Sequence, residues 1–579
     1  MHGYAAPLDD ILRAMRVAGL AELLAAPAYD GVDEATVAAA LEGFGAVAAE
    51  VITPTDAIAD RQAPVLDRAT AQVAVPGEVA RAFEEYMSGG WGAIAAPVEH
   101  GGGGMPKIVA TAVHEMFGSA NMSLSLNPML TQSGIELLEQ WGSERQRQVV
   151  LPRLTSGEWT GTMNLTEPDA GSDLGAVRTT AEPAGDGRWV INGTKIFITW
   201  GEHELRPNII HLVLARTPGA PAGTKGISLF IVPKVHFDDD GALGERNGVR
   251  CVGLEHKLGI HGSPTCVMSF EDAIGEMVGP QHGGMAAMFS MMNPARLAVG
   301  VQGVSIGERA LQQARAYAAE RRQGADAARP GASVTIDVHP DVRRMIADMA
   351  STVDAIRLLC AATSIEGDLA HVHPDADRRD HARRRADLLT PLAKAFGSDQ
   401  GVRLASVAVQ VHGGMGFIEE TGVAQRYRDA RIAPIYEGTN GIQAIDLVFR
   451  KIVRDGGQAL GELLDDATAS AASAAAATDL AAVGSELAAA TTSARELGQW
   501  ILANAGPDRN TVLSGATGYL ELLSLVTCAQ LLVQAALSQE GAARTAAVAR
   551  ARCFSANLLA RRPGAADITL PSTAIDAAL

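Results

Sequence analysis

The sequence predicts an α+β multidomain protein in which an antiparallel β domain lies between helical domains. The chain has 579 residues, more than one ordinary hydrophobic core accommodates, and 47% of them are hydrophobic. Apolar residues recur at helical spacing towards both ends, whereas β-type runs gather in the middle. These observations predict domains at residues 1–160, 161–275, 276–455 and 456–579.

The N-terminal domain is expected to be mostly helical. The segment "DEATVAAALEGFGAVAAEVITPT" has apolar residues at helical spacing after an aspartate that can cap a helix. The segments "IVATAVHEMFGSANMSLSL" and "GIELLEQWGSERQRQVVLPRL" continue the same pattern. Between the helices, the glycine-rich stretch at residues 89–106 predicts a surface loop or turn.

The middle domain is expected to consist of short strands. In "RWVINGTKIFITWG", Asn192-Gly193 stands between two β-type runs, which predicts a hairpin turn at this pair. The segments "NIIHLVLAR", "GISLFIVPK" and "TCVMSFEDA" predict further strands. Turn residues separate these runs at short intervals, which is typical of an antiparallel sheet.

The remaining chain returns to helical patterns that we expect to bundle together. Long amphipathic stretches cover residues 284–322, begin again at His339, and continue through "DLLTPLAKAFGSDQGVRLASVAVQVHGG". After residue 456 the chain is rich in alanine but carries spaced charges. We interpret this region as a further helical domain, whose first part is either helix or linker.

Charge and cysteine content exclude several classes of function. The net charge of −18, from 48 basic and 66 acidic residues, argues against a nucleic-acid partner. The five cysteines contain no C-x-x-C pair, which favours reduced thiols in the cytoplasm. The first residues do not resemble a signal peptide, and no uncharged apolar run is long enough to predict a membrane-spanning helix.

Common nucleotide and hydrolase motifs are absent or out of context. No G-x-G-x-x-G or G-x-x-x-x-G-K-[ST] occurs, so neither a Rossmann domain nor a P-loop is supported. The match to G-x-S-x-G around Ser305 lies inside a helical pattern, where small residues favour close helix packing. The histidines show no clear zinc spacing, and no metal site is predicted.

One acid stands out in "RIAPIYEGTNGIQ", residues 431–443. Apolar neighbours of Glu437, including Ile432, Ile435 and Tyr436, can desolvate its carboxylate and raise its pKa, as a general base requires. Gly438 lets a substrate approach the backbone. The alternative, a first-turn acid that interacts with a helix dipole, has equal weight on these residues alone.

Two further segments carry features of a binding site. "MNLTEPDAGSDLGAVRTTA" offers hydroxyl and backbone N–H donors in a tight turn, which can hold a heterocycle edge or a phosphate, or can simply be a capped turn. "QVHGGMGF" ends a helix with paired glycines, which is typical either of a helix C-terminus or of close backbone approach to a ligand.

Taken together, these segments resemble the acyl-CoA dehydrogenase family. "NLTEPDAGSD", "KIFIT", "YAAERRQG", "QVHGGMGF" and "RDARIAPIYEGTNGIQ" occur in the family's order, and the resemblance covers roughly residues 35–455. The opening "YAAPLDDILRAM", the phrase "TWGEHELRPNIIHLVLAR" and the C-terminal region resemble the family's larger members.

The resemblance implies a fold and a reaction. It implies a β-barrel-like middle domain and a C-terminal four-helix bundle, with FAD held between them. It further implies that Glu437 removes the α-proton of an acyl-CoA while a β-hydride passes to flavin N5. The product is then a trans-2-enoyl-CoA, as in fatty-acid β-oxidation. The backbone N–H of Glu437, together with a flavin hydroxyl, is expected to stabilise the developing enolate.

The resemblance also assigns binding residues by position. Many relatives have tryptophan where Phe197 stands, and phenylalanine keeps the stacking face without the N–H donor. Positions expected to contact FAD, some of them across a dimer interface, are Met163, Leu165, Thr166, Ser172, Phe197, Thr199, Arg321, Gln323, Gln410, Gly414 and Thr439. Positions expected to contact the acyl-CoA are Ser172, Asn293, Arg296 and Gly438, although relatives often have aspartate where Asn293 stands.

The expected partners are an acyl-CoA substrate, an electron-transfer flavoprotein and a second copy of the chain in a homodimer. We expect no nucleic acid and no stable membrane insertion, because the alanine-rich helices lack a basic amphipathic face. Two alternatives remain: an acyl-CoA oxidase that uses oxygen, and a DNA-binding flavoprotein of the same fold. The second needs a basic C-terminal face, which acidic "ELLDD" does little to support.

Overall fold

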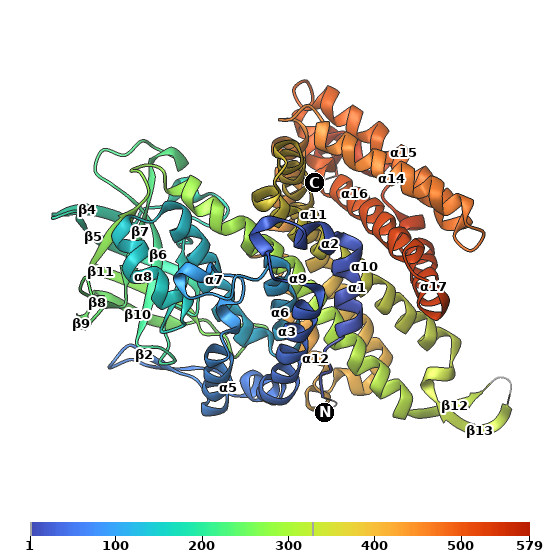
Figure 1. Cartoon of the computed structure of the whole chain (residues 1–579), viewed down its shortest axis with the longest axis horizontal. Coiled ribbons are helices and arrows are strands. Elements are labelled where there is room, and N and C mark those ends of the chain that lie inside the picture. Colours follow the sequence, from blue (N-terminus) through green and yellow to red (C-terminus); the bar gives the residue numbers. More distant parts are fainter. Residues whose placement is uncertain (1–2, 327–328, 579) are drawn as a thin grey trace. The chain divides into compact units, whose positions relative to one another are not determined.

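The structure is a computed structural model that describes residues 3–326 and 329–578 (Figure 1). The chain forms two compact units. Unit 1 comprises Met1–Glu42 and Arg296–Leu579, and unit 2 comprises Gly43–Ala295.

The first 160 residues are mostly helical, as predicted. A pair of short strands, β1 (Val65–Asp67) and β2 (Gln72–Ala74), was not anticipated. The glycine-rich stretch at residues 89–106 forms only single turns, which agrees with the predicted loop. The helices of this segment are α1 (Leu8–Ala18), α2 (Leu20–Leu24), α3 (Glu34–Val47), α4 (Asp56–Arg61), α5 (Gly77–Ser88), α6 (Lys107–Ala120), α7 (Met122–Trp141) and α8 (Glu144–Thr155).

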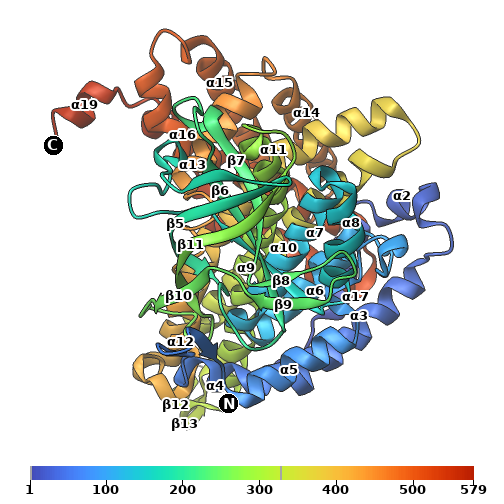
Figure 2. The same cartoon turned by 90° about the vertical axis from the view of Figure 1, so that its left-hand side faces the viewer.

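The strands of unit 2 close into a ring, which confirms the barrel-like domain. β11 pairs with β5, β5 with β4, β4 with β6, β6 with β7, and β7 again with β11 (Figure 2). β10 and β3 extend this sheet at its two edges, and β8 (Val235–Phe237) pairs with β9 (Leu243–Arg246) separately. The strands of the sheet are β3 (Trp159–Asn164), β4 (Thr180–Gly185), β5 (Arg188–Thr199), β6 (Asn208–Arg216), β7 (Ile227–Pro233), β10 (Val249–Leu254) and β11 (Thr265–Val278).

The sheet departs from the antiparallel prediction at β3. This strand runs parallel to β6, with Trp159 opposite Asn208 and Asn164 opposite Val213. A parallel pair needs a long connection between its strands, and here the whole β4–β5 hairpin supplies it. The domain is therefore a mixed sheet whose other long ladders are antiparallel.

The hairpin predicted at Asn192-Gly193 is wrong, because β5 runs straight through this pair. The turn lies instead at Asp186 and Gly187, both of which have positive φ as a two-residue hairpin loop requires. Gly193 has another role. A Cβ at this position would lie 2.4 Å from the Thr179 hydroxyl oxygen, so only glycine lets the neighbouring segment pass so closely.

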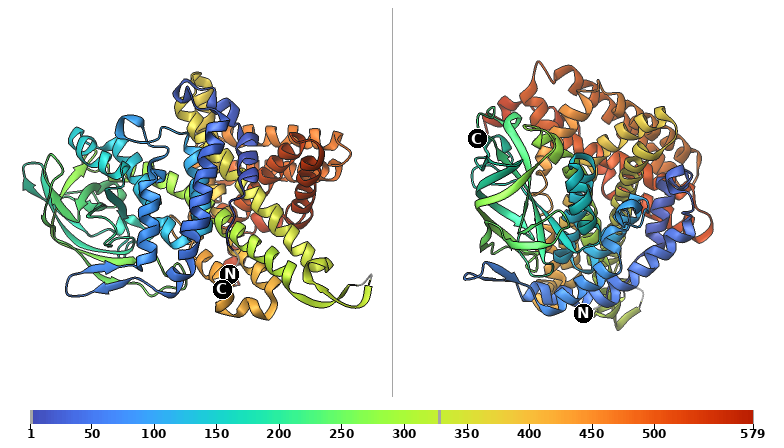
Figure 3. Two further views of the ribbon diagram at one scale, coloured as in Figure 1. Left: turned by 60° about the horizontal axis from the view of Figure 1, so that its bottom comes forward. Right: turned by 60° about the vertical axis from the view of Figure 1, so that its left-hand side comes forward.

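Unit 1 contains the predicted helical bundle, except that residues 284–295 of its first helix belong to unit 2. A hairpin of β12 (Arg322–Asp326) and β13 (Arg329–Thr335) joins α9 to α10 and projects beyond their ends (Figure 3). α11 ends at His412, and Gly413 follows with φ +60°, which confirms "QVHGG" as a helix C-terminus. The bundle helices are α9 (Gly284–Glu320), α10 (Pro340–Val372), α11 (Ala376–His412), α12 (Val423–Ala430) and α13 (Asn440–Asp446).

Glycines bring α9 and α11 into close contact. A Cβ at Gly303 would lie 2.0 Å from the carbonyl oxygen of Gly397, and a Cβ at Gly300 would lie 2.6 Å from that of Ala393. Ser305 is fully buried in the same helix, and its hydroxyl donates to the carbonyl of Val301. The G-x-S-x-G match is thus helix packing, as interpreted from the sequence.

The C-terminal region is helical from Gln458 onwards, so its first part is not a linker. α16 packs against α10, α11 and α13, and α17 packs against α10. The helices of this region are α14 (Gln458–Ala476), α15 (Ala481–Asn504), α16 (Arg509–Leu537), α17 (Gly541–Asn557), α18 (Ala565–Ile568) and α19 (Ser572–Asp576).

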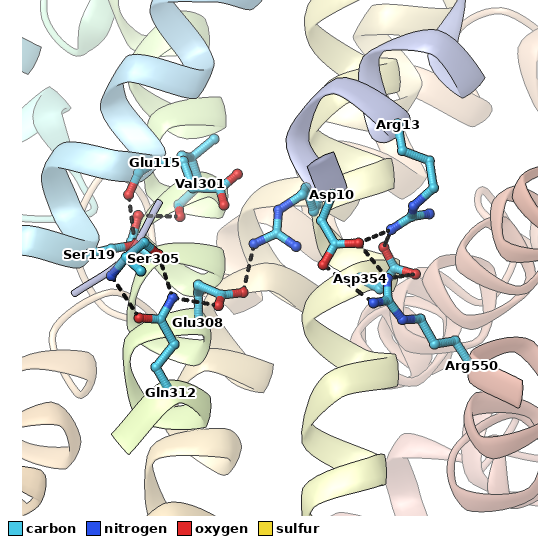
Figure 4. Close-up of polar contacts among 12 residues, drawn as sticks. Asp10, Arg13, Glu115, Ser119, Val301, Ser305, Glu308, Gln312, Asp354 and Arg550 are labelled. Carbon is cyan, nitrogen blue, oxygen red and sulfur yellow. Dashed lines mark hydrogen bonds and ion pairs between the residues drawn. The ribbon is translucent and has the colours of Figure 1, made fainter. Parts of the chain in front are cut away.

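A cluster of charges joins α1, α10 and α17 (Figure 4). Arg550 on α17 binds Asp10 on α1 at 2.8 Å and Asp354 on α10 at 3.2 Å. Arg13 on α1 also pairs with both carboxylates. Burial alone would raise the pKa of Asp10, but the hydrogen bond and charge of Arg550 outweigh it and hold that pKa well below its usual range.

Two helical stretches reach the length and composition of a membrane span, which the sequence analysis did not anticipate. The stretch Arg509–Leu537 is 83% buried within the protein over its most apolar window, as expected of a core helix. The stretch Glu34–Arg61 is 33% buried.

Substitution of Gly303 by alanine should destabilise unit 1. The added methyl group forces α9 and α11 apart, and overpacking of this kind costs about 1–3 kcal/mol. Gly367→Ala on α10 is the matched control, because a Cβ there meets no atom within 4 Å. Thermal unfolding of the holoenzyme should show a lower Tm for Gly303→Ala and an equal or higher Tm for the control. A Tm for Gly303→Ala at or above the wild type would contradict this packing.

Asp10→Asn should lower stability at neutral pH and lose this effect in acid. Because the folded state depresses the pKa of Asp10, its carboxylate stabilises the protein above its unfolded pKa of about 4, and this contribution disappears as the pH falls. The Tm difference between wild type and variant should therefore stay constant down to about pH 4 and shrink as the pH falls below it. Asp9→Asn, which removes an exposed carboxylate from the same turn, is the control for the loss of one charge.

Candidate active site

Glu437 lies in a tight turn and not in the first turn of a helix. α13 begins at Asn440, and its N-cap is Thr439, whose hydroxyl accepts from the Ile442 N–H at 3.2 Å. Glu437 precedes this cap by two residues, so the helix-dipole alternative does not describe its position. The Asn440 N–H donates to the carbonyl of Pro434 at 3.0 Å and closes the turn around Glu437.

The turn holds Glu437 in a strained conformation. Glu437 has φ +54° and Gly438 has φ +79°, so two successive residues are left-handed. A non-glycine residue in this region costs on the order of 1–3 kcal/mol and persists only where its surroundings fix it. The fully buried side chain of Gln443 does so, since its amide donates to the carbonyls of Glu437 at 3.3 Å and Gly438 at 3.2 Å.

The electrostatics of the turn suit a general base. The Glu437 side chain is half-buried, and burial raises its pKa above the usual range, while the charges of Arg296 and Lys394 partly oppose the rise. No residue of the described chain donates a hydrogen bond to its carboxylate oxygens. A carboxylate with a raised pKa and free lone pairs can accept a proton near neutral pH.

Arg296, an expected acyl-CoA contact, is buried beside this turn. It lies on α9, and its guanidinium is 3.3 Å from the carboxylate of Asp446, which Arg450 also binds at 3.2 Å. Burial lowers the pKa of Arg296, against the charges of Asp446 and Glu437. Asn293 precedes it by one helical turn and is half-buried. Contact of either residue with a ligand stays a prediction.

Unit 2 gathers most of the other predicted FAD positions around the loop after β3. Met163 lies near the end of β3. Two residues of β5 bind the loop that follows: the Lys195 ammonium donates to the carbonyl of Leu165 at 3.1 Å, and the Ile196 N–H donates to that of Thr166 at 2.9 Å. Phe197 follows directly, so the half-buried Thr166 and the exposed Phe197 lie close together. Ser172 is exposed in the same loop.

Glu167 organises this loop, which the sequence analysis did not foresee. Its carboxylate accepts from the Arg178 N–H at 2.7 Å, the Thr179 N–H at 3.0 Å and the Lys195 ammonium at 2.8 Å. Lys195 is fully buried, and burial lowers its pKa to about 8 against the charge of Glu167. A buried ion pair with these hydrogen bonds fixes the backbone that carries the predicted FAD contacts.

Phe197 presents an aromatic ring from a strained backbone. It has φ +60° and its side chain is 58% exposed, unusual for a ring of this size. Two residues on, Thr199 accepts through its carbonyl from the Thr162 hydroxyl at 2.7 Å. Trp200 has φ +52° and its indole donates to the carbonyl of Ser123 at 3.1 Å. An exposed ring, a hydroxyl and a rigid loop fit one face of a flavin.

The remaining predicted FAD positions lie at one end of the bundle. The rings of Tyr317 on α9 and His412 on α11 stack at 4.3 Å and bring these two helix ends together. Four predicted residues lie close to these rings in the sequence, and all of them are exposed: Arg321, Gln323, Gln410 and Gly414. In the described chain they are available to a ligand or to a second copy.

Family comparisons agree with this arrangement. Residues 52–158, 162–273 and 282–452 match the N-terminal, middle and C-terminal domains of acyl-CoA dehydrogenase, and residues 461–570 match a region described as acetyl-CoA dehydrogenase C-terminal like. The chain belongs to the acyl-CoA dehydrogenase family, whose members are oxidoreductases that use FAD.

Two curated relatives extend the match. A 3-methylmercaptopropionyl-CoA dehydrogenase of Ruegeria pomeroyi is 48% identical over 458 residues, which cover 79% of this chain and 77% of the relative. The broad-specificity linear acyl-CoA dehydrogenase FadE5 of Mycobacterium tuberculosis is 37% identical over 468 residues, which cover 79% and 76%.

Solved structures share the fold. ACDH-11 of Caenorhabditis elegans, crystallised with C11-CoA, superposes with a TM-score of 0.81 and 21% identity over 96% of this chain and 92% of that chain. An acyl-CoA dehydrogenase of Bacillus anthracis, complexed with FAD, gives 0.74 and 21% identity over 92% and 87%. These two likenesses therefore extend over the C-terminal helices as well as the bundle.

Glu437→Gln should change how stability depends on pH. The folded state raises the pKa of Glu437, so the ionised carboxylate destabilises the protein, and wild type loses stability as the pH rises from the unfolded pKa of about 4 through the folded one. The Tm of the variant minus that of wild type should grow across this window and then level off. Glu419→Gln is the control for the loss of one glutamate charge elsewhere in the same unit.

Proposed function

We propose that the protein catalyses α,β-dehydrogenation of an acyl-CoA thioester to a trans-2-enoyl-CoA, with Glu437 as the base that removes the α-proton. The observation that carries this proposal is the free carboxylate on a left-handed turn, with its pKa raised by burial. Membership of the acyl-CoA dehydrogenase family supplies the reaction class.

The chain's own residues contribute position and charge. Gln443 fixes the backbone of the turn that carries Glu437, and alignment of base and substrate is a large part of the rate. FAD supplies the acceptor for the β-hydride. The N–H of Glu437 is available to a thioester oxygen, where a backbone donor would stabilise the charge that develops as the proton leaves.

We assign FAD to the predicted positions in both units. In unit 2 these are Met163, Leu165, Thr166, Ser172, Phe197 and Thr199. In unit 1, Thr439 lies next to the base, and Arg321, Gln323, Gln410 and Gly414 form the exposed group at the end of the bundle. Because that group is exposed in one chain, it supports a homodimer in which it reaches the partner's cofactor.

The substrate is an acyl-CoA, contacted by Ser172, Asn293, Arg296 and Gly438. A left-handed glycine with φ +79° beside the base leaves the backbone accessible to a thioester. 3-Methylmercaptopropionyl-CoA is the first substrate to test, because the relative of that name is 48% identical. We further propose a cytoplasmic enzyme that passes its electrons to an electron-transfer flavoprotein.

Glu437→Gln should retain the yellow flavin and lose substrate-dependent bleaching. Removing a general base lowers the rate by about 10²–10⁴-fold. The experiment mixes holoenzyme anaerobically with 3-methylmercaptopropionyl-CoA and with linear acyl-CoAs of increasing length. Glu419→Gln, an exposed acid from the same unit, should bleach at the wild-type rate. Normal bleaching by Glu437→Gln would remove Glu437 from the mechanism.

Electron transfer to oxygen is tested in the same preparation. A dehydrogenase should reduce a dye acceptor or an electron-transfer flavoprotein and form little peroxide in air. Stoichiometric peroxide from each turnover would instead identify an acyl-CoA oxidase.

A further inference from the structure

A buried lysine lies beneath the turn that carries Glu437. Lys394 is on α11, within the apolar run "LLTPLAKAFGS", and its side chain has no exposed area. Burial of an ammonium group is costly unless hydrogen bonds and an opposite charge compensate it. The neighbours of Lys394 therefore indicate why the sequence tolerates a cation in this helix.

Its hydrogen bond leads directly to the turn. The Lys394 ammonium donates to the side-chain oxygen of Asn440 at 2.8 Å. The amide nitrogen of Asn440 donates to the carbonyl of Ala395 at 3.2 Å and to the hydroxyl of Ser398 at 3.1 Å. Asn440 also closes the turn through its backbone bond to Pro434. The Asn440 side chain thus binds the part of the turn after Glu437 to three residues of α11.

The charges that face Lys394 are Glu437, Asp399 and Arg296. Asp399 is on α11 itself, and burial raises the pKa of its carboxyl against the charge of Lys394. Arg296 on α9 has the same sign as Lys394 and pairs with Asp446. Of these charges, that of Glu437 has the largest effect on Lys394, ahead of Asp399. The charges that face Glu437 in turn are Arg296 and Lys394.

We propose that Lys394 is a positioning residue for the Glu437 base, which it serves by anchoring the turn through Asn440 and by placing a positive charge beneath the carboxylate. This role rests on the proposed function of Glu437. It differs from substrate contact, because Lys394 is fully buried and reaches the reaction only through the turn.

The pKa shifts of Lys394 and Glu437 support the same role. Burial lowers the pKa of Lys394 to about 8, and the charge of Glu437 opposes this fall. Burial raises the pKa of Glu437, and the charges of Arg296 and Lys394 oppose that rise. Below about pH 8 the ammonium therefore helps to keep Glu437 ionised, and loss of that charge moves the ionisation of Glu437 to higher pH.

The test is the pH profile of flavin reduction in single turnovers of Lys394→Met holoenzyme. The profile should move to higher pH by about one unit, and the rate on its acid limb should fall about tenfold. KM for the acyl-CoA should change little, because Lys394 does not touch it. Lys394→Arg keeps a cation and should restore most of the wild-type profile.

Lys451→Met is the matched control. Lys451 pairs with Asp387 at 3.0 Å in the same unit, so its loss removes a lysine ion pair away from the base. It should leave the pH profile unchanged. A lower Tm for Lys394→Met with an unshifted profile means that Lys394 only stabilises the fold, and it overturns the proposal.

Two further variants keep the proposal testable if Lys394→Met yields no folded holoenzyme. Lys394→Gln, which keeps polarity without charge, must then show the shifted profile. Asn440→Ala, which keeps the cation but cuts its bond to the turn, must lower kcat. Wild-type behaviour in either variant overturns the proposal. Failure of the proposed function is distinct, since Glu437→Gln would then still reduce its flavin.

Discussion

The close contact between α9 and α11 determines the surroundings of the base. Arg296 on α9 and Lys394 on α11 are the two cations that face Glu437, and the helices meet at Gly300 and Gly397 immediately after them. A Cβ at Gly300 would lie 3.3 Å from the backbone nitrogen of Lys394. Because no side chain separates the helices here, both cations lie near one turn. Larger side chains at these glycines would move Arg296 and Lys394 apart.

The C-terminal helices belong to the same unit as the base. Arg550 on α17 and Arg13 on α1 share the carboxylates of Asp10 and Asp354, so the first helix of the chain and one of its last helices meet on α10. α16 packs on α11, to which Asn440 binds the Glu437 turn, and on α13, which follows that turn. The extension thus supports the scaffold of the turn and is more than an appended domain.

Patterns of several residues predicted the fold well, and single residues did so less reliably. Helical periodicity and β-type runs identified the order of helices and strands, because burial of one face repeats along an element. The hairpin turn predicted at Asn192-Gly193 was wrong, because a glycine can allow close packing as well as a turn. The hairpin loop is Asp186-Gly187. The parallel pairing of β3 with β6 depends on contacts between distant segments, which local patterns do not contain.

The residues of the candidate site also differ in how well the sequence predicted them. Motif order singled out Glu437 and the segment around Phe197, but it did not indicate Glu167, Gln443 or Asn440, which hold these segments. Polar residues of this kind are common in turns and helix ends, and only their partners in space distinguish them. Lys394 left one signal, a charge within an apolar helical run, which is rare unless a partner compensates it.

Two of the predicted site residues, Phe197 in unit 2 and Glu437 in unit 1, have a strained backbone. Both residues have positive φ, as do several other non-glycine residues of the described chain, and the buried side chain of Gln443 holds Glu437 in this conformation. Strain of this kind survives selection where a relaxed conformation would turn the side chain away from its task. For Phe197 that task is an exposed ring, and for Glu437 it is an unshared carboxylate. A relaxed right-handed turn at residue 437 would point the carboxylate elsewhere, so the left-handed backbone is itself an argument that the direction of this acid matters.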